Sequence, residues 1–369
     1  MSCLSNNEEE ARRYSSIKYS LSVAEWCYAL ALLAVFLFSG LSALLVKAAY
    51  SISSSGWLAM PVYLLLVFFL YYILNFPLNF YRTLLLEHQF KLSRQSMKDW
   101  FLDQLKAGVI SYFISVVILE VFYLLLSRQP EHWWWIISLF WIFLSLVLAK
   151  LAPVLIIPLF FKYKKYSDEN IRRRIIKLAG KMDVKILDVF EIDLSRKTAK
   201  GNAALVGFGN TRRVILGDTL KDKYSADEIE VVLAHEFAHQ KLGHLFKLVL
   251  SGVITTVVCM FAIYKTSPYV LGFFHLQSLS QTAAMPVVFI YLLLAGALFQ
   301  PWENFLSRRF ERQADKLAIQ STGLKDAFVS TMEKLSGQNL SDRSPHPVIK
   351  FFFFDHPAID ERIRSARSF

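Results

Sequence analysis

Cysteine is scarce in this chain of 369 residues, and the three present are scattered at Cys3, Cys27 and Cys259. No two of them stand at the CxxC spacing of redox or metal motifs, and no disulfide framework is implied. Two lie in apolar runs, where cysteine behaves as a small buried hydrophobic residue. The sequence therefore argues against a disulfide scaffold and against a cysteine-rich structural zinc site.

Charged residues are also few, at 19%, whereas 54% of residues are hydrophobic and the mean hydropathy is +0.37. This composition is too apolar for a soluble enzyme of this size. The net charge of +11 could suggest nucleic acid. However, the basic residues gather beside hydrophobic spans rather than in a patch interleaved with aromatic residues. We therefore predict an integral membrane protein, with the lipid bilayer and not nucleic acid as its partner.

Six apolar stretches are predicted to span the membrane, which takes ~20 apolar residues in a helix. They cover approximately residues 26–46, 57–80, 107–126, 133–157, 246–264 and 285–299. The first twenty residues are polar and lack the apolar core of a cleavable signal. The first span is therefore expected to remain as a signal anchor.

Lysine and arginine are distributed unevenly between the loops. They gather in residues 81–106 and 161–174, whereas the connections at 127–132 and 265–284 contain few of them. By the positive-inside rule, this places the long loops, both ends and the catalytic region on the cytoplasmic side. The pattern does not distinguish a bacterial inner membrane from the endoplasmic reticulum.

The strongest chemical signal is the motif His-Glu-Phe-Ala-His at residues 235–239. In a helix, His235 and His239 lie on one face, where two imidazoles can bind the same Zn²⁺. Glu236 can then take a proton from a water whose pKa zinc lowers from ~16 to ~7. His244 lies off this face and is expected to be an ordinary helix-end histidine. The motif predicts a hydrolase of peptide bonds with one Zn²⁺ per chain.

The residues around this motif predict a small mixed region. Residues 169–182 have the periodicity of an amphipathic helix. Strands are predicted at 186–193, 203–208 and 213–216. The turn residues Gly209-Asn210-Thr211 predict a hairpin between the last two strands.

A catalytic zinc site usually has a third protein ligand, and Glu311 is the best candidate for it. Asp315 lies one helical turn further along the chain, where it could orient a ligating imidazole through a hydrogen bond. Together with Arg308 and Arg312, however, these acids could equally form a salt-bridged, solvated helix face. Spacing alone leaves both interpretations open.

The motif at 235–239 and the pattern Asn304-x-x-Ser307-Arg308-x-x-Glu311-x-x-Ala314-Asp315 together resemble the type I CAAX prenyl proteases. These are integral-membrane zinc metallopeptidases related to a bacterial heat-shock membrane protease. Three further stretches are similar to that family: Asn202 to Leu220, His244 after the motif, and His356-Pro357 followed by Glu361-Arg362. The resemblance covers roughly residue 82 to the C-terminus.

The resemblance implies that His235, His239 and Glu311 ligate zinc. It also implies that Glu236 acts as the general base. Asp315 would not ligate the metal but would orient a ligating imidazole from the side away from the metal. These assignments agree with the interpretation of the residues themselves, and they favour Glu311 as a ligand over the solvated helix face.

Substrate contacts are implied by the resemblance alone. Asn202 and Ala203 would pair with the substrate backbone as an added strand. His356 would stand near the scissile carbonyl, and Arg362 would support substrate binding. A peptide or protein substrate is therefore expected, possibly prenylated or membrane-bound. Ala358 stands where the family often has a second proline, and eukaryotic members have seven spans where six are counted here.

Two alternatives remain at this point. A quality-control protease that cuts misfolded membrane proteins would use the same chemistry. A noncatalytic transporter or scaffold fits less well, because a structural zinc site has no use for a base at Glu236.

The expected fold is mainly α: a polytopic helical membrane protein with about six transmembrane helices and a zincin-like catalytic region that contains a small β-sheet. Residues 1–160 should form a membrane region of four helices, and residues 161–245 a catalytic region with the edge strand and the motif helix. Two more transmembrane helices are expected in 246–303. The remaining residues, 304–369, should carry the third zinc ligand and the His-Pro and Arg element.

Overall fold

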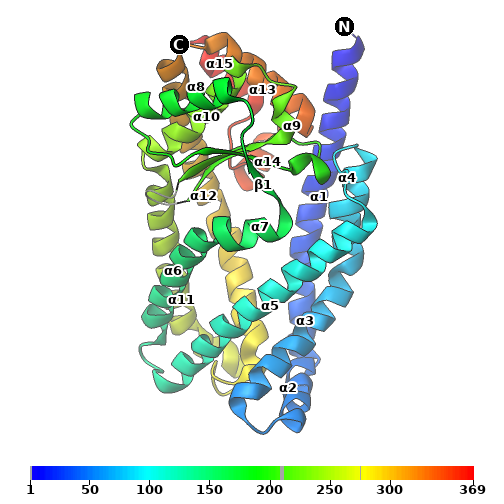
Figure 1. Ribbon diagram of the computed structural model, residues 1–369. Helices are drawn as coiled ribbons and strands as arrows, with labels where there is room; N and C mark the ends of the chain where they lie inside the picture. The colour runs from blue at the N-terminus through cyan, green and yellow to red at the C-terminus, as the bar shows by residue number, and fades with distance from the viewer. Residues whose placement is uncertain (1, 208–211, 275) are drawn as a thin grey trace.

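The computed structural model describes residues 2–207, 212–274 and 276–369. It consists of a long helical bundle with a mixed head at one end, where a small sheet lies among shorter helices (Figure 1). Six helical segments of the described chain are long and apolar enough to cross a membrane: Asn7–Phe38, Gly56–Gln89, Met97–Arg128, Trp133–Phe160, His244–Phe273 and Thr282–Thr322. The mainly helical class and the six predicted spans are confirmed.

The first predicted span differs from the structure at its ends. Helix α1 (Ser2–Phe38) stops before Gly40, whose φ of 71° is left-handed and suits glycine, and α2 (Leu41–Ile52) follows as a separate short helix. The predicted first span is therefore confirmed as a span, but its predicted end at residue 46 was too late, because residues 41–46 belong to α2.

The region predicted as a basic loop at 81–106 is largely helical. Helix α3 (Gly56–Phe80) continues through a π-helical turn into α4 (Leu86–Gln89), and α5 (Met97–Arg128) begins a few residues later. The basic residues of this region therefore lie mostly on the ends of long helices and not in an extended loop.

The rest of the bundle is formed by four helices: α6 (Trp133–Leu151), α7 (Ile157–Phe160), α11 (His244–Phe273) and α12 (Met285–Thr322). Its core is aromatic and aliphatic. Trp133 packs edge-on against Phe122 at 5.7 Å between ring centres, and Tyr63 and Ile263 are each about 1% exposed. Large apolar side chains such as Phe113 and Leu298 are exposed on the outside of the same helices. A bundle that is apolar on both sides is suited to a lipid environment.

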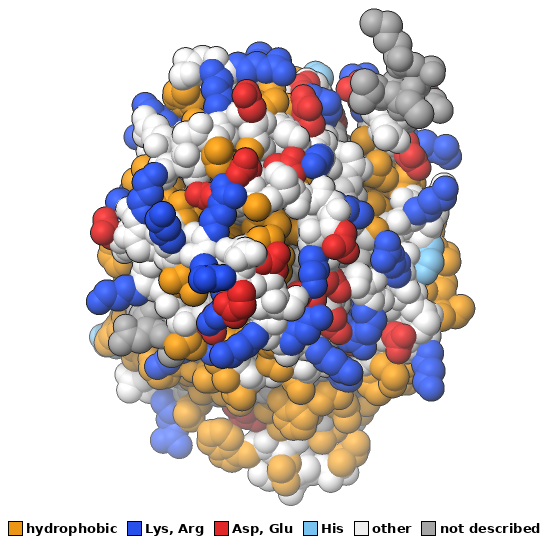
Figure 2. Space-filling view, turned by 45° about the horizontal axis from the view of Figure 1, so that its top comes forward, with side chains coloured by type: hydrophobic (Ala, Val, Ile, Leu, Met, Phe, Trp, Pro, Cys, Tyr) orange, Lys and Arg blue, Asp and Glu red, His pale blue; other side chains and the backbone are white. Residues whose placement is uncertain are grey.

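The distribution of charge separates the head from the bundle. Lys, Arg, Asp and Glu side chains cover the head, and hydrophobic side chains dominate the surface of the bundle below it (Figure 2). This division, with the six apolar helices, identifies an integral membrane protein that crosses the bilayer several times.

The head contains a four-stranded sheet in the order β1-β2-β4-β3. Its strands are β1 (Tyr163–Lys165), β2 (Val189–Ile192), β3 (Ala203–Val206) and β4 (Arg213–Gly217). The three predicted strands are confirmed, the first two with shorter bounds and the third one residue longer, and β3 and β4 pair antiparallel as the predicted hairpin requires. The predicted turn Gly209-Asn210-Thr211 lies outside the described residues. Strand β1 was missed because three residues are too few to show an alternating pattern.

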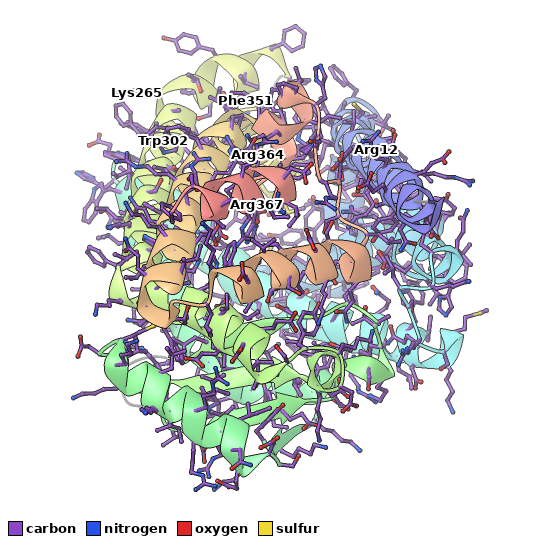
Figure 3. All side chains as sticks on the ribbon, turned by 90° about the horizontal axis from the view of Figure 1, so that it is seen from above. Arg12, Lys265, Trp302, Phe351, Arg364 and Arg367 are labelled. Atoms are coloured by element: carbon purple, nitrogen blue, oxygen red, sulfur yellow. The ribbon has the colours of Figure 1, made fainter. Side chains whose placement is uncertain are left out.

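Six helices complete the head: α8 (Glu169–Lys181), α9 (Asp218–Lys221), α10 (Ala226–Lys241), α13 (Lys325–Asn339), α14 (Pro347–Phe353) and α15 (Ile359–Arg367). From above, α15 with Arg364 and Arg367 lies over the middle of the head, whereas α1 with Arg12 stands at its side (Figure 3). The amphipathic helix predicted at 169–182 is confirmed as α8, which buries Ile175, Leu178 and Ala179.

Helix α10 packs along the last third of α12, and alanines form the contact. Ala234 and Ala238 of α10, with Ala314 and Ala318 of α12, have no measurable exposure. Because alanine has only a methyl side chain, the two helix axes can approach closely. This close contact brings the polar residues that border it on both helices into reach of one another.

Candidate active site

The start of helix α10 is fixed by a capping box. The Ser225 hydroxyl accepts the backbone N–H of Glu228, and the Glu228 carboxylate accepts the backbone N–H of Ser225 at 2.7 Å. Glu228 is itself buried and also accepts hydrogen bonds from Ser330 and Lys334 of α13. The helix therefore has a defined position and rotation, and its histidine face is directed at α12.

Three side chains meet between α10 and α12. His235 Nε2 lies 3.0 Å from His239 Nε2 and 3.3 Å from Glu311 Oε2. His239 Nε2 lies 3.1 Å from Glu311 Oε1. The structure thus brings together the three residues predicted as metal ligands, with one potential ligand atom from each within 4.8 Å of the others.

The spacing of these atoms fits a zinc ion. Ligand atoms around a tetrahedral Zn²⁺ with bonds of about 2.0–2.1 Å stand about 3.3 Å apart. The two ring nitrogens are 3.0 Å apart, and they lie 3.3 and 3.1 Å from the carboxylate oxygens of Glu311. Two imidazoles and one carboxylate are also a donor set of catalytic zinc sites, which leave a coordination position open for water.

A charged pair supports His235 from behind. Asp315 Oδ1 lies 2.9 Å from His235 Nδ1, an ion-pair distance, while His235 Nε2 is directed at Glu311. Arg362 of α15 donates to the same carboxylate through Nε at 2.9 Å and Nη2 at 2.6 Å. The predicted position of Asp315 behind a ligating imidazole agrees with this geometry.

The same carboxylates control the protonation of His235. Burial by itself would lower the pKa of this imidazole, but Asp315 and Glu311 outweigh burial and raise the pKa to about 10. Without a metal, the ring therefore holds a second proton at neutral pH. A metal ion that binds there must replace this proton.

A series of hydrogen bonds between uncharged groups supports His239. Gln313 Oε1 lies 3.0 Å from His244 Nε2, and His244 Nδ1 lies 3.1 Å from His239 Nδ1. If the amide oxygen accepts from His244 Nε2–H, then His244 Nδ1 accepts from His239 Nδ1–H. This sequence of hydrogen bonds leaves the lone pair of His239 Nε2 directed at the metal position.

The prediction that His244 stands at a helix end and is not a metal ligand agrees with the structure, but its side chain has a contact with His239 that the spacing did not indicate. His244 does begin α11, after Gly243 with a left-handed φ of 67°, but its ring is 1% exposed and stacks on Phe310 at 4.6 Å. The turn at Gly243 directs the imidazole back onto α10. Its match to the continuation of the motif was the one sequence signal for this role.

Glu236 and His356 complete the surroundings of the cluster. Glu236 is half-buried on α10, and its charge joins those of Asp315 and Glu311 in raising the pKa of Arg362 against the effect of burial. His356 Nε2 lies 3.5 Å from Glu311 Oε1, with 54% of its side chain exposed. Burial would lower the pKa of His356, but Asp355 and Glu311 raise it. An exposed imidazole that favours its protonated form thus borders the cluster.

Two buried polar residues of α12 hold the segment that carries His356. Asn304 donates to the carbonyl of Phe352 at 2.7 Å, and Arg308 donates to the carbonyl of Lys350 at 3.0 Å. Both side chains thus bind the backbone of α14. In the sequence, Asn304 belongs only to the family pattern, and Arg308 also fits a solvated helix face; neither pattern indicates these contacts. Their contacts join residues more than forty positions apart, which no local pattern reveals.

Strand β3 is an edge of the sheet, with β4 as its strand partner and α10 packed nearby. Asn202 is exposed just before the strand, and its carbonyl accepts the backbone N–H of Gly217 at 2.9 Å. A Cβ on Gly217 would lie 2.9 Å from this backbone carbonyl oxygen of Asn202, so the close approach of the two strands favours glycine there. Asn202 and Ala203 therefore lie at the start of an edge strand. The Arg362 side chain is bound to Asp315, and its predicted contact with substrate stays a prediction.

Comparison with known families gives two matches. Residues 5–162 match the CAAX prenyl protease N-terminal model, which is described as having five membrane helices, and residues 165–369 match the model of peptidase family M48. Four long apolar helices and the short α2 lie in the first of these regions.

Individual proteins show the same likeness. The chain is 30% identical over 282 residues to an uncharacterized metalloprotease, YhfN, of Bacillus subtilis, an alignment that covers 75% of this chain and 66% of the relative. It is 28% identical over 310 residues to CAAX prenyl protease 1 of Saccharomyces cerevisiae, covering 79% and 68%. The chain thus spans about two thirds of the length of these relatives. The crystal structure of S. mikatae Ste24p superposes with a TM-score of 0.86 at 26% identity, covering 98% of this chain and 88% of that one.

Proposed function

The chain belongs to peptidase family M48 and is a multi-pass membrane metallopeptidase, and from this premise we propose that it cleaves prenylated peptide tails as a CAAX prenyl protease. The observation that carries the proposal is the convergence of His235, His239 and Glu311 next to an edge strand. An edge strand can hold an extended peptide, and an extended peptide presents its carbonyls to one side.

We propose that His235, His239 and Glu311 hold one Zn²⁺ per chain. Bound there, the ion would supply Lewis-acid polarisation of the scissile carbonyl and would lower the pKa of water to ~7. Asp315 and His244 would fix the two imidazoles in the tautomers that ligation needs. The ion-pair contact of Asp315 with His235 at 2.9 Å and the hydrogen bond between His244 and His239 at 3.1 Å support this assignment.

The proton transfers would fall to Glu236. As general base it would take a proton from the attacking water, and as general acid it would pass that proton to the departing amine. His356 is exposed beside the cluster and favours its protonated form, so it would donate to the oxygen that becomes negative in the transition state. Asn202 and Ala203 would pair with the substrate backbone. The role of Arg362 would be to hold Asp315, and through it His235.

The chain would then consist of four regions: a membrane region at 1–160, a catalytic region at 161–245, two membrane helices at 246–303 and a C-terminal catalytic region at 304–369. The last boundary falls inside α12, so the third ligand would stand on the continuation of a membrane helix. The basic residues at 81–106 and 161–174 support a cytoplasmic location for the head.

The test is zinc content and cleavage of matched prenylated and plain peptides by the detergent-purified full chain and its Glu236→Gln variant. We expect about one zinc per chain in both proteins. Cleavage should fall by at least ~1000-fold in the variant, because the base is lost and the ligands remain. Glu333→Gln, an exposed change on α13, is the matched control and should cut normally.

The peptide panel separates the two uses of this chemistry. A strong preference for prenylated peptides supports tail processing. Equal cleavage of plain and prenylated peptides would instead favour quality-control proteolysis. If Glu236→Gln cut as fast as the wild type, the mechanism proposed for this site would be wrong.

A further inference from the structure

The open side of β3 offers the backbone groups of two residues to a bound peptide. The strand pairs antiparallel with β4, and the Asn202 carbonyl accepts the backbone N–H of Gly217. Along such a pair, the N–H and C=O groups of successive residues alternate between the two sides of the strand. Asn202 and Ala204 therefore face β4, whereas Ala203 and Leu205 face the open side. Asn202 would then pair with a substrate through its side-chain amide.

The open side is closed at Gly201, two residues before Ala203. The backbone N–H of Gly201 donates to Asn339 Oδ1 at 3.0 Å, and its carbonyl accepts from Asn339 Nδ2 at 3.4 Å. The carboxamide of Asn339 thus takes the place of a partner strand, and a bound peptide has to end or turn away here. Antiparallel pairing is the more stable arrangement, and it directs the C-terminal end of the peptide toward Gly201.

Two lysines stand at this end of the strand. Lys200 Nζ lies 5.4 Å and Lys18 Nζ of α1 lies 5.2 Å from the centre of the Tyr14 ring. Lys200 is paired with Glu87 at 2.8 Å and also donates to the Tyr14 hydroxyl at 3.0 Å. Lys18 has no ion-pair partner among the residues that the structure describes. The group of two lysines and one acid therefore has one positive charge in excess.

The Lys18 side chain is directed into the protein. A lysine on a membrane helix often extends along it to the lipid surface, but Lys18 is half-buried and its ammonium lies over Tyr14, which is 3% exposed. The next residue, Tyr19, stacks on Phe353 of α14 at 6.1 Å between ring centres. Helix α1 thus contacts the segment before the edge strand and the helix before His356. Lys18 lies between these two contacts, beside the candidate active site.

The excess charge selects an anion on the substrate. A free C-terminal carboxylate is present on every peptide tail, whereas an internal loop has none. Charge-assisted hydrogen bonds between an ammonium and a carboxylate are among the stronger polar contacts, and partial burial strengthens them further. Arg362, the base predicted to support substrate binding, is bound to Asp315. Lys18 is instead available at the end of the strand to which the C-terminal part of the peptide is directed.

We propose that Lys18, with Lys200 beside it, binds the C-terminal carboxylate of a short peptide tail that pairs with Ala203 and Leu205. Lys18 is then a specificity-determining residue that selects tails over internal loops. This inference rests on the proposed function, because it requires a peptide on the edge strand. It adds the group by which the site recognises the end of its substrate.

The test measures binding of a prenylated CAAX peptide, labelled with a fluorophore at its N-terminus, to the zinc-loaded full chain in detergent. Glu236→Gln is the background, so that the peptide stays intact. We expect the free carboxylate to bind ~10-fold more tightly than the C-terminal amide. Adding Lys18→Met should reduce this ratio to within about twofold by weakening the carboxylate peptide alone. Arg12→Met, an exposed change on the same helix, should leave the ratio unchanged.

A conservative variant and a longer tail make the result decisive. Lys18→Arg keeps the charge and should keep most of the preference, so it tests the site even if Lys18→Met fails to fold. A tail lengthened by four residues carries its carboxylate past Lys18, and its acid and amide forms should bind equally. Equal binding of the short acid and amide, or an unchanged ratio in Lys18→Met, would overturn the proposal.

Cleavage by the protein with Glu236 separates this inference from the proposed function. If acid and amide peptides were cut at equal rates and bound equally, the peptidase assignment would stand and the role of Lys18 would be wrong. If neither peptide were cut by the zinc-loaded protein, the proposed function would be wrong. The binding ratio would still decide whether Lys18 recognises the carboxylate.

Discussion

The two histidines of α10 are held by partners of opposite kinds. His235 faces the carboxylate of Asp315 at an ion-pair distance of 2.9 Å, and that carboxylate is paired in turn with Arg362. His239 bonds to His244, and His244 bonds to the neutral amide of Gln313. Both supports fix a tautomer, but only the first adds charge to the site. The charged support therefore sets how strongly a proton competes with a metal at His235, whereas the neutral one acts through orientation alone.

The largest effect should come from removing the group that both histidines share. Glu311→Ala takes away the carboxylate that faces both imidazoles, so we expect metal content to collapse and peptide cleavage to fall by ~1000-fold or more. Metal analysis and single-turnover cleavage measure this. Glu303→Ala, on the same helix one turn before Ser307, is the control. Normal metal content in Glu311→Ala would remove Glu311 from the ligand set.

Removing the charged support should come next. Asp315→Asn keeps the size of the side chain but removes its charge, and we expect about 100-fold weaker zinc binding in competition with a chelator. Asp326→Asn changes an exposed acid of α13 and should bind zinc as the wild type does. A zinc affinity within twofold of the wild type would show that the charge of Asp315 does not contribute to zinc binding by His235.

The pH dependence sharpens the same comparison. Because the pKa of His235 is raised from 6.5 to about 10, zinc must displace a proton at neutral pH. Apparent zinc affinity should rise up to ~10-fold per pH unit between pH 7 and 9, and binding should release a proton measurable in weak buffer. For the metal-free protein the sign is opposite. The stability that protonated His235 contributes is complete below pH 6.5 and is lost as the pH approaches 10. A flat affinity profile would contradict the raised pKa.

The smallest effect is expected from the neutral support. Gln313→Leu removes the acceptor that fixes His244, and we expect at most ~10-fold weaker zinc binding with an unchanged pH slope, since no charge is altered. Gln320→Leu, exposed on the same helix, controls for the change of residue type. If Gln313→Leu changed the slope as Asp315→Asn should, the division between charged and neutral support would be wrong.

Local patterns were sufficient for a large part of the fold and of the site. The spacing of His235 and His239, the six apolar spans and the hairpin of β3 and β4 each depend on residues close together in the chain. The placement of Glu311 needed the family pattern, because its own spacing fitted a solvated helix face equally well.

Other features depend on contacts that no local pattern contains. Arg362 reaches Asp315 across 47 positions, and Gln313 reaches His244 across 69. The break at Gly40 was missed because a single glycine in an apolar stretch is compatible with a continuing helix.

Helix α12 has a mechanical consequence. It runs unbroken for 38 residues, from the membrane bundle to beyond Asp315, with Pro301 between its two parts. A helix of this length acts as a stiff lever, and its tilt in a bilayer follows the thickness of the hydrocarbon layer. Any such tilt would move Glu311 and Asp315 relative to α10, except for the part that bending at Pro301 absorbs. The candidate metal site thus stands on the continuation of a helix whose tilt is set within the membrane bundle.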